Sequence, residues 1–239
     1  MAEDSERYVP GLVWSRSRPT GRGARPKLDR EAIVRGAIEL LDRDGLEGLS
    51  MRQLGGHLNT AATTLYWHVV NKEELLDLTF DEVMGEVPDP GESGDWRDRI
   101  TLMLCELRAM MLRHPWYVRL YGRPSFGPQS MRLNANLVGV LKRAGFEGAL
   151  LDQALAGLSQ YVIGTVTNEL SWNTWRQLPR TQLEPMLEYI GETIAAYPDY
   201  ADYLQGYLMT VDPETVLEGR FMTALQSLLD GLAIRLNGK

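Results

Sequence analysis

The fold is decided by residues 61–76, which read AATTLYWHVVNKEELL. The second half of this stretch carries a helix start, because Asn71 can cap a helix while Glu74 completes the N-x-x-E spacing of a capping box. We expect this helix to continue to about residue 86. A much shorter helix, at about residues 61–68, precedes it and ends in a Tyr-Trp-His run. The stretch therefore predicts two consecutive helices of very different length.

Two further helices are expected before this stretch. Asp29 can cap the first, and Gly45 and Gly48 are expected to end it. Ser50 and Gln53 have the S-x-x-Q spacing of a capping box, so a short second helix begins there. The first of these helices carries an apolar stripe with helical spacing: Ile33, Val34, Ala37, Ile38 and Leu41.

The second and third helices fit the requirements of a helix-turn-helix. Gly55 supplies a small residue at the position of close approach, and Asn59 is the non-glycine residue best suited to positive φ in the turn. Leu54, Leu58 and Leu65 fall where these helices must pack on the first. The alternative is a plain three-helix head without a nucleic-acid role.

The rest of the chain is expected to be helical as well. Residues 87–96, VPDPGESGDW, contain two prolines and two glycines and form the best candidate boundary. Beyond them no stretch shows the strict alternation of a strand. The sequence predicts an all-α fold, in which a three-helix head is joined by a fourth helix to a larger helical bundle. Helical segments are expected at about residues 97–113, 116–122, 129–144, 149–172, 183–196, 199–208 and 214–236.

Charge is distributed unevenly along the 239 residues, whose formal net charge is −7. Residues 14–72 carry ten Lys/Arg and six Asp/Glu, a balance of +4, whereas residues 73–239 carry 14 basic and 23 acidic side chains, a balance of −9. A basic N-terminal part can direct that end of the protein toward a polyanion such as DNA. Solvated surfaces also vary by this much without any such role.

Cysteine content and hydropathy bear on the compartment. Cys105 is the single cysteine, so one chain cannot form a disulfide framework, which fits a reducing cytosol. No apolar run approaches the roughly 20 residues that span a bilayer. The N-terminus lacks the apolar core of a signal peptide. We expect a cytoplasmic protein that makes no membrane contact.

The residues that decide the fold also carry a resemblance to a known family. Residues 28–87 resemble the DNA-binding head of the tetracycline-repressor (TetR) family, and TLYWHVVNKEELL is similar to its best-preserved stretch. The Tyr-Trp-His run and the following Leu-Leu-Asp are nearest to the tetracycline repressor's own subgroup. RLYGRPSFGPQSMRLNANLVGVLKRAGF and QYVIGTVTNEL resemble its ligand-binding part more faintly. The resemblance implies a transcriptional repressor that binds a palindromic operator in double-stranded DNA as a homodimer and is released by a small molecule.

The resemblance implies a division of roles on the DNA side. Base reading falls to the start of the recognition helix, whose short side chains offer methyl contacts and hydroxyl hydrogen bonds. Arg52 matches a family position whose arginine reaches the DNA. Tyr66 and Lys72 are expected at the phosphates, where they position the protein without reading sequence. The expected base-reading residues are Ala61, Ala62, Thr63 and Thr64.

Two of the aromatic positions leave alternatives open. Trp67 and His68 can contact the DNA or can pack between helices; packing is favoured for Trp67, and the two readings are even for His68. The sequence also departs from the family where Asn59 replaces a turn glycine and where Val70 replaces a basic residue.

Residues 1–27 are expected to form a flexible basic arm, with the helix-turn-helix domain at residues 28–87 and a ligand-binding and dimerisation domain at residues 97–236. The segment SRSRPTGRGARPK, residues 15–27, is rich in Gly, Pro and Arg without apolar periodicity. It can enter a minor groove or contact the DNA backbone, and a solvated tail is the equal alternative. The arm residues expected at the DNA are Arg22, Arg25 and Lys27.

The resemblance also implies a dimer that is formed by two late helices, and it implies a small-molecule pocket. Residues 150–170 and 216–232 suit the dimer, although both can equally be core helices of one chain. The expected interface residues are Ala154, Gly157, Leu158, Tyr161, Leu217, Phe221, Leu225 and Leu228. The expected pocket is mostly apolar, for a largely apolar or aromatic effector. Its candidate lining is Met103, Leu107, Met110, Trp116, Tyr117, Tyr121, Phe126, Tyr161, Trp172 and Trp175.

A tetracycline–magnesium effector is not expected. In the tetracycline repressor a histidine before the Arg-Pro pair and a glutamate on the later helix carry that chemistry. This sequence has Arg119 or Tyr121 before Arg123, and Asn168 near the glutamate position. His114 is the only histidine beyond the head, so we expect no metal site and no cofactor.

The alternatives to a regulator are an all-α enzyme with a buried apolar pocket and a helical protein-interaction module. The sequence contains no G-x-S-x-G, G-x-x-x-x-G-K, H-E-x-x-H or paired-cysteine motif. Cys105 lies on an apolar helix and reads as a small hydrophobic residue. We therefore expect no enzymatic activity.

Overall fold

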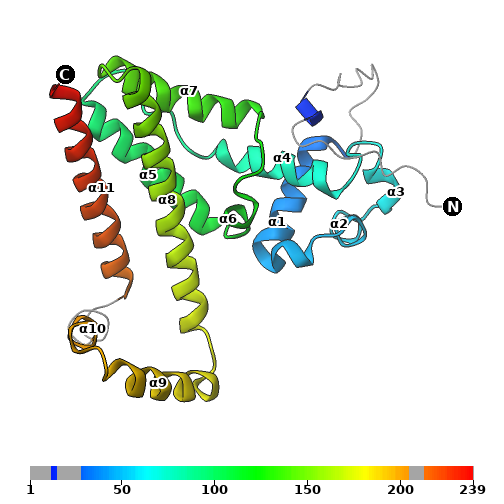
Figure 1. The fold of residues 1–239 in the computed structure, drawn as a ribbon. Helices are drawn as coiled ribbons and strands as arrows, with labels where there is room; N and C mark the ends of the chain where they lie inside the picture. The colour runs from blue at the N-terminus through cyan, green and yellow to red at the C-terminus, as the bar shows by residue number, and fades with distance from the viewer. Residues whose placement is uncertain (1–11, 15–27, 205–212, 239) are drawn as a thin grey trace. The chain divides into compact units, whose positions relative to one another are not determined.

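The computed structural model describes residues 12–14, 28–204 and 213–238. Within these residues the chain is helical and contains no strand, so the all-α prediction is confirmed (Figure 1). The chain divides into two compact units, Met1–Ala156 and Gly157–Lys239. None of the described helices is long and apolar enough to cross a membrane.

Apart from α3, the helices match the predicted segments closely. The first unit contains η1 (Leu12–Trp14), α1 (Arg30–Gly48), α2 (Met51–His57), α3 (Ala62–Leu65), α4 (Lys72–Met84), α5 (Trp96–Arg113), α6 (Trp116–Leu120), α7 (Pro128–Arg143) and the start of α8 (Gly148–Arg176). The second unit contains the rest of α8, α9 (Arg180–Ile194), α10 (Pro198–Tyr203) and α11 (Pro213–Asn237).

Local sequence signals explain where the head helices begin. The side-chain oxygens of Asp29, Ser50 and Asn71 each accept a hydrogen bond from the backbone N–H three residues later, at 2.7, 3.2 and 2.8 Å. All three residues have extended backbone, as N-caps require. Gly45, with a φ of 69°, interrupts α1 before its end. The predicted starts of α1, α2 and α4 are confirmed.

Helix α4 joins the head to the rest of the first unit. It packs against α1 on the head side and against α5 and α7 on the other. Its Phe80 ring stacks on Tyr117 of α6, with ring centroids 4.2 Å apart and planes 9° apart. Residues 85–95 form the loop between α4 and α5 and contain most of the expected boundary stretch, yet α1 to α7 belong to one compact unit because α4 contacts both sides.

A buried carboxylate on α4 fixes the start of α7. Asp81 is only 2% exposed. Its carboxylate accepts hydrogen bonds from the backbone N–H and the hydroxyl of Ser130, each at 2.8 Å, and from the backbone N–H of Gln129 at 3.2 Å. A Cβ added to Gly127 would lie 2.1 Å from Asp81, so only glycine fits there. A negative charge at a helix N-terminus is also favoured by the helix dipole.

In the second unit, α8 and α11 meet at an aromatic pair. The Tyr161 hydroxyl donates a 2.5 Å hydrogen bond to the backbone carbonyl of Phe221, and the two ring centroids lie 5.4 Å apart. Helix α9 has no buried residue. The buried apolar residues of this unit are Leu158, Val162, Val166, Phe221, Leu225, Leu229 and Leu232.

Candidate nucleic-acid interface

The turn between α2 and α3 has the geometry that a helix-turn-helix requires. Asn59 is the only non-glycine residue with positive φ among those described, at 52°. A Cβ added to Gly55 would lie 2.9 Å from the backbone oxygen of Thr60 and 3.1 Å from the backbone nitrogen of Ala62. The predicted reasons for glycine at one position and asparagine at the other are confirmed.

The recognition helix is shorter than the sequence indicated. Helix α3 has four residues, Ala62–Leu65, where residues 61–68 were predicted. The following residues form a tight turn, in which the backbone N–H groups of Trp67 and His68 bond the carbonyls three residues earlier at 3.2 and 2.9 Å. Ala61 offers no side-chain cap. Leu65 is fully buried and anchors this short helix to the head, as expected.

The face around α3 presents short side chains and then large aromatic ones. Ala61 and Thr63 are exposed, while Ala62 and Thr64 are half-buried. At the end of α3, the exposed fractions of the Tyr66 and Trp67 side chains are 51% and 86%.

Trp67 does not pack between helices. The favoured sequence interpretation is therefore wrong, because Leu65 and Val69 fill the space under the turn and leave the indole in solvent. His68 is half-buried, and Arg52 at the start of α2 is exposed.

Lys72 has a structural contact that the sequence did not reveal. Its ammonium donates hydrogen bonds to the backbone carbonyls of Leu46 and Leu49, at 3.0 and 2.7 Å. These bonds fasten the start of α4 to the end of α1. An ammonium has three N–H donors, so one donor is left over for an anion.

Glu74 makes two further contacts within the head that the sequence did not reveal. This buried carboxylate accepts a hydrogen bond from the backbone N–H of Val70 at 3.0 Å and one from the Arg30 guanidinium at 3.2 Å. The N-x-x-E spacing predicted that Glu74 would accept from the backbone N–H of the N-cap Asn71, whereas the donor in the structure is Val70, one residue earlier. The second contact joins residues 44 positions apart and had no local signal.

The arm residues Arg22, Arg25 and Lys27 lie outside the described residues, so their expected contact with DNA stays a prediction.

The structure brings together only some of the residues expected to line an effector pocket. Four of them are buried in α5 and α6: Met103, Met110, Trp116 and Tyr117. Leu107, which also lies on α5, is half-buried. Burial raises the pKa of the Tyr117 hydroxyl, which keeps it neutral.

The remaining pocket candidates are distributed differently. Tyr121 and Phe126 are largely exposed in the first unit. Trp172 and Trp175 are exposed in the second unit and contact each other, with ring centroids 6.3 Å apart. Tyr161 is half-buried there.

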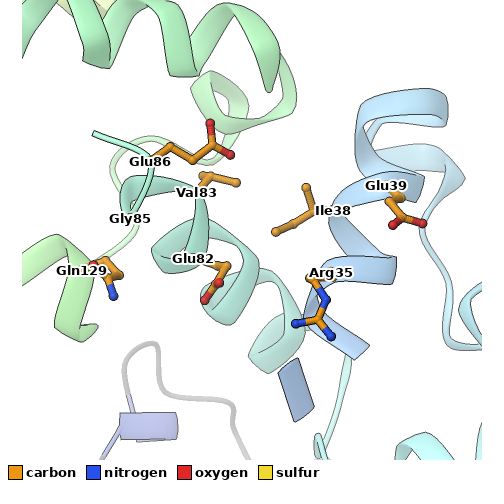
Figure 2. A pocket seen from close by; sticks show the side chains of 8 residues that line it. All are labelled: Arg35, Ile38, Glu39, Glu82, Val83, Gly85, Glu86 and Gln129. Carbon is orange, nitrogen blue, oxygen red and sulfur yellow. The ribbon is translucent and has the colours of Figure 1, made fainter. Parts of the chain in front are cut away.

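A cavity of about 470 Å³ lies between α1, α4 and the start of α7 (Figure 2). No pattern in the sequence predicted this cavity. Ionic and polar side chains dominate its lining, so it differs from the mostly apolar pocket that was expected. The lining residues are Arg35, Ile38, Glu39, Glu82, Val83, Gly85, Glu86 and Gln129.

The expected dimer residues fall into two groups. Ala154, Leu158, Phe221 and Leu225 are fully buried within the chain, so they belong to the core of one protomer and their assignment to an interface is corrected. The other four are half-buried: Gly157, Tyr161, Leu217 and Leu228.

An all-α chain with a correctly built helix-turn-helix and exposed aromatic side chains at the end of α3 is typical of a DNA-binding regulator. Comparison with known proteins narrows this class. The family described as "Bacterial regulatory proteins, tetR family" matches residues 33–78. The family described as "Tetracyclin repressor-like, C-terminal domain" matches residues 87–236. The chain belongs to the TetR family of transcriptional regulators.

Individual relatives agree with this assignment. An HTH-type transcriptional regulator of Saccharopolyspora erythraea is 46% identical over 195 residues, 81% of this chain and 81% of the relative. The HTH-type transcriptional repressor DrrR1 of Streptomyces coeruleorubidus is 32% identical over 93% of this chain and 84% of its own length. The crystal structure of Streptomyces coelicolor ActR in complex with actinorhodin has a TM-score of 0.72 and 29% identity, covering 87% of this chain and 97% of ActR.

Proposed function

We propose that this protein is a homodimeric repressor that binds a palindromic operator through α2 and α3 and releases it when a small molecule binds. The observation that carries the proposal is the exposed face at the end of α3, where Trp67 has no partner to pack on within its own helix-turn-helix. A single short recognition helix reads only a few base pairs, so two heads about one DNA turn apart are needed. The protein would act in the cytoplasm and without catalysis.

On the DNA, the short side chains at the start of α3 read bases and the aromatic end binds the backbone. Thr63 is exposed and offers both a methyl group and a hydroxyl to a base edge. Tyr66 and Trp67 each carry one polar hydrogen on a large exposed ring, which suits phosphate oxygens. Arg52 supplies the long side chain that α3 lacks.

Glycines in α8 and α11 support a dimer through these helices. A Cβ added to Gly157, Gly164 or Gly231 would meet no atom within 4 Å, so packing within the chain does not require glycine there. Glycine inside a helix is unfavourable by roughly 0.8–1 kcal/mol relative to alanine. Close approach of a second copy would explain why small residues occupy these positions.

The effector is proposed to be a small, largely apolar or aromatic molecule. ActR, which is 29% identical to this chain, has been solved with actinorhodin bound. In this chain, Met103, Met110 and Trp116 supply an apolar, aromatic environment in α5 and α6. Effector binding would favour a state in which the heads no longer fit the half-site spacing.

The test is selection of fragments of the parent genome with the purified protein, followed by binding of the selected duplex at several salt concentrations. A selected sequence with two related half-sites, bound with an affinity that falls steeply as salt rises, supports the proposal. No enrichment, or an affinity that does not change with salt, overturns it in favour of an enzyme or a protein-interaction module.

A further inference from the structure

A buried histidine lies between carboxylates from two parts of the first unit. His114 follows α5 and is only 6% exposed. Its Nδ1 lies 2.7 Å from Oδ1 of Asp42 on α1, and its Nε2 lies 2.9 Å from Oε1 of Glu86 just beyond α4. The imidazole therefore connects a helix of the DNA-binding head with the end of the helix that leads away from it.

Two further side chains hold these carboxylates in place. The indole N–H of Trp116 donates to the same oxygen of Asp42 at 2.7 Å. The Arg113 guanidinium donates to the other oxygen of Glu86, at 2.6 and 3.1 Å. The Trp116 ring also lies beside the imidazole, with centroids 5.8 Å apart. The groups that surround the ring from α1, α4, α5 and α6 are thus two acids, one guanidinium and one indole.

A separate ion pair joins α1 and α6 nearby. Arg119 and Glu47 approach to 2.7 Å, but both side chains are more than half exposed. Exposed pairs contribute little and are screened by salt. The contacts of His114, in contrast, are made by a buried ring and are therefore screened less by salt.

The geometry suits a ring that is protonated on both nitrogens. A neutral imidazole has one N–H donor and one acceptor, whereas both ring nitrogens here face carboxylate oxygens, which only accept. Partial burial alone would raise the pKa of Glu86, but hydrogen bonds from Arg113 and His114 outweigh it and lower that pKa. With Glu86 ionised, only the imidazolium can donate on both sides.

We propose that His114 is a positioning residue for DNA binding, whose protonated ring fixes α1 to the end of α4 and makes operator affinity dependent on pH. The inference rests on the proposed function. Helix α1 packs against α2 and α4, and α2 in turn packs against α3. Loosening α1 lets the recognition helix sample more orientations, and ordering it again on the DNA weakens binding.

The direction of the pH effect follows from the charges. Histidine is the side chain whose charge can change between pH 5 and 8, and only its doubly protonated form makes both hydrogen bonds. When the ring carries one proton, a nitrogen lone pair faces a carboxylate. Because the pKa of Glu86 is lowered, its contribution to the stability of the fold is fully present above the ordinary range for glutamate. This contribution is lost only as the pH falls through the lowered pKa.

The protonation state can be read directly by nitrogen NMR of the imidazole rings. The sequence contains three histidines, His57, His68 and His114. Single substitutions to Gln assign the three sets of signals. We expect both ring nitrogens of His114 to carry a proton at pH 6. A neutral tautomer at pH 6 would overturn the inference.

Operator affinity is then measured from pH 6 to pH 8 at constant ionic strength, using the duplex selected above. The comparison is made in a His68→Gln background, which removes the histidine next to the recognition helix. Affinity is expected to fall about fivefold or more over this range, and His114→Gln should weaken binding at pH 6 and remove most of the slope. A slope unchanged by His114→Gln overturns the inference.

His57→Gln is the matched control. His57 contacts a single carboxylate, that of Glu39 at 2.7 Å, within the head, so the pH slope should survive its replacement. Asp42→Asn provides a second variant if His114→Gln unfolds, and it should reduce the slope because the amide lacks the charge. A protein that binds no duplex at any pH or salt concentration refutes the proposed function, whereas tight binding with no slope refutes only the role of His114.

Discussion

At the scale of single residues, Gly55 and Gly56 are adjacent on α2 and meet different surroundings. A Cβ at Gly55 would approach the backbone of the turn to 2.9 Å, whereas one at Gly56 would meet nothing within 4 Å. We expect Gly55→Ala to destabilise the protein by about 1–3 kcal/mol, because the turn backbone must shift. Gly56→Ala should stabilise it by about 0.4–1 kcal/mol through the unfolded state. Thermal unfolding followed by circular dichroism measures both.

Replacement of Trp67 should weaken DNA binding without lowering the stability of the fold. Because its side chain is 86% exposed, Trp67→Ala should change the free energy of unfolding by no more than about 0.5 kcal/mol. Loss of an indole contact in each half-site should weaken DNA binding by about 1–3 kcal/mol in total, alike for all duplexes. Leu65→Ala is the contrasting variant, since burial predicts a loss of about 2–5 kcal/mol in stability. A clear loss of stability in Trp67→Ala would contradict the assignment.

At the scale of helices, the sequence predicted most of what local chemistry controls. Asp29, Ser50 and Asn71 begin helices because each side chain satisfies a backbone N–H within three residues. The exposure of Trp67 and the carbonyl contacts of Lys72 could not be predicted, because the first depends on which residues of the turn are buried and the second on how α4 lies against the end of α1. Local patterns define helix starts, and tertiary packing decides which side chains face solvent.

Asp81 connects two helices, and its replacement tests how much this connection stabilises the fold. It joins α4 to the N-terminus of α7 by accepting from two backbone N–H groups and a hydroxyl in a buried position. Asp81→Ala leaves these donors without their acceptor, so we expect a loss of about 3 kcal/mol in the free energy of unfolding. Glu82→Ala, the exposed neighbour on the same helix, should change it by about 0.5 kcal/mol or less. Denaturant unfolding of both variants is the measurement, and equal losses would refute the role of the carboxylate.

At the scale of the whole molecule, the sequence predicted two helices for dimerisation but did not predict which of their faces are buried within one chain. Half of the expected interface residues, such as Leu158 and Phe221, lie in the core of one protomer. Helical periodicity marks an apolar face without saying whether the same chain or a second copy covers it. Glycines that face open space, such as Gly231, are the better guide, because no atom of the described residues lies close enough to require them.

Gly231 therefore provides the test of the assembly. Gly231→Leu should stabilise α11 within a single chain, since leucine is favoured over glycine in helices by roughly 0.5–1 kcal/mol. If a second copy approaches this position closely, the new side chain will block the approach. We then expect sedimentation velocity to show monomers and operator affinity to fall about tenfold or more, because paired heads bind two half-sites. Gly191→Leu on α9, where an added Cβ also meets open space, should leave the dimer intact. A Gly231→Leu protein that remains dimeric would place the interface elsewhere on the chain.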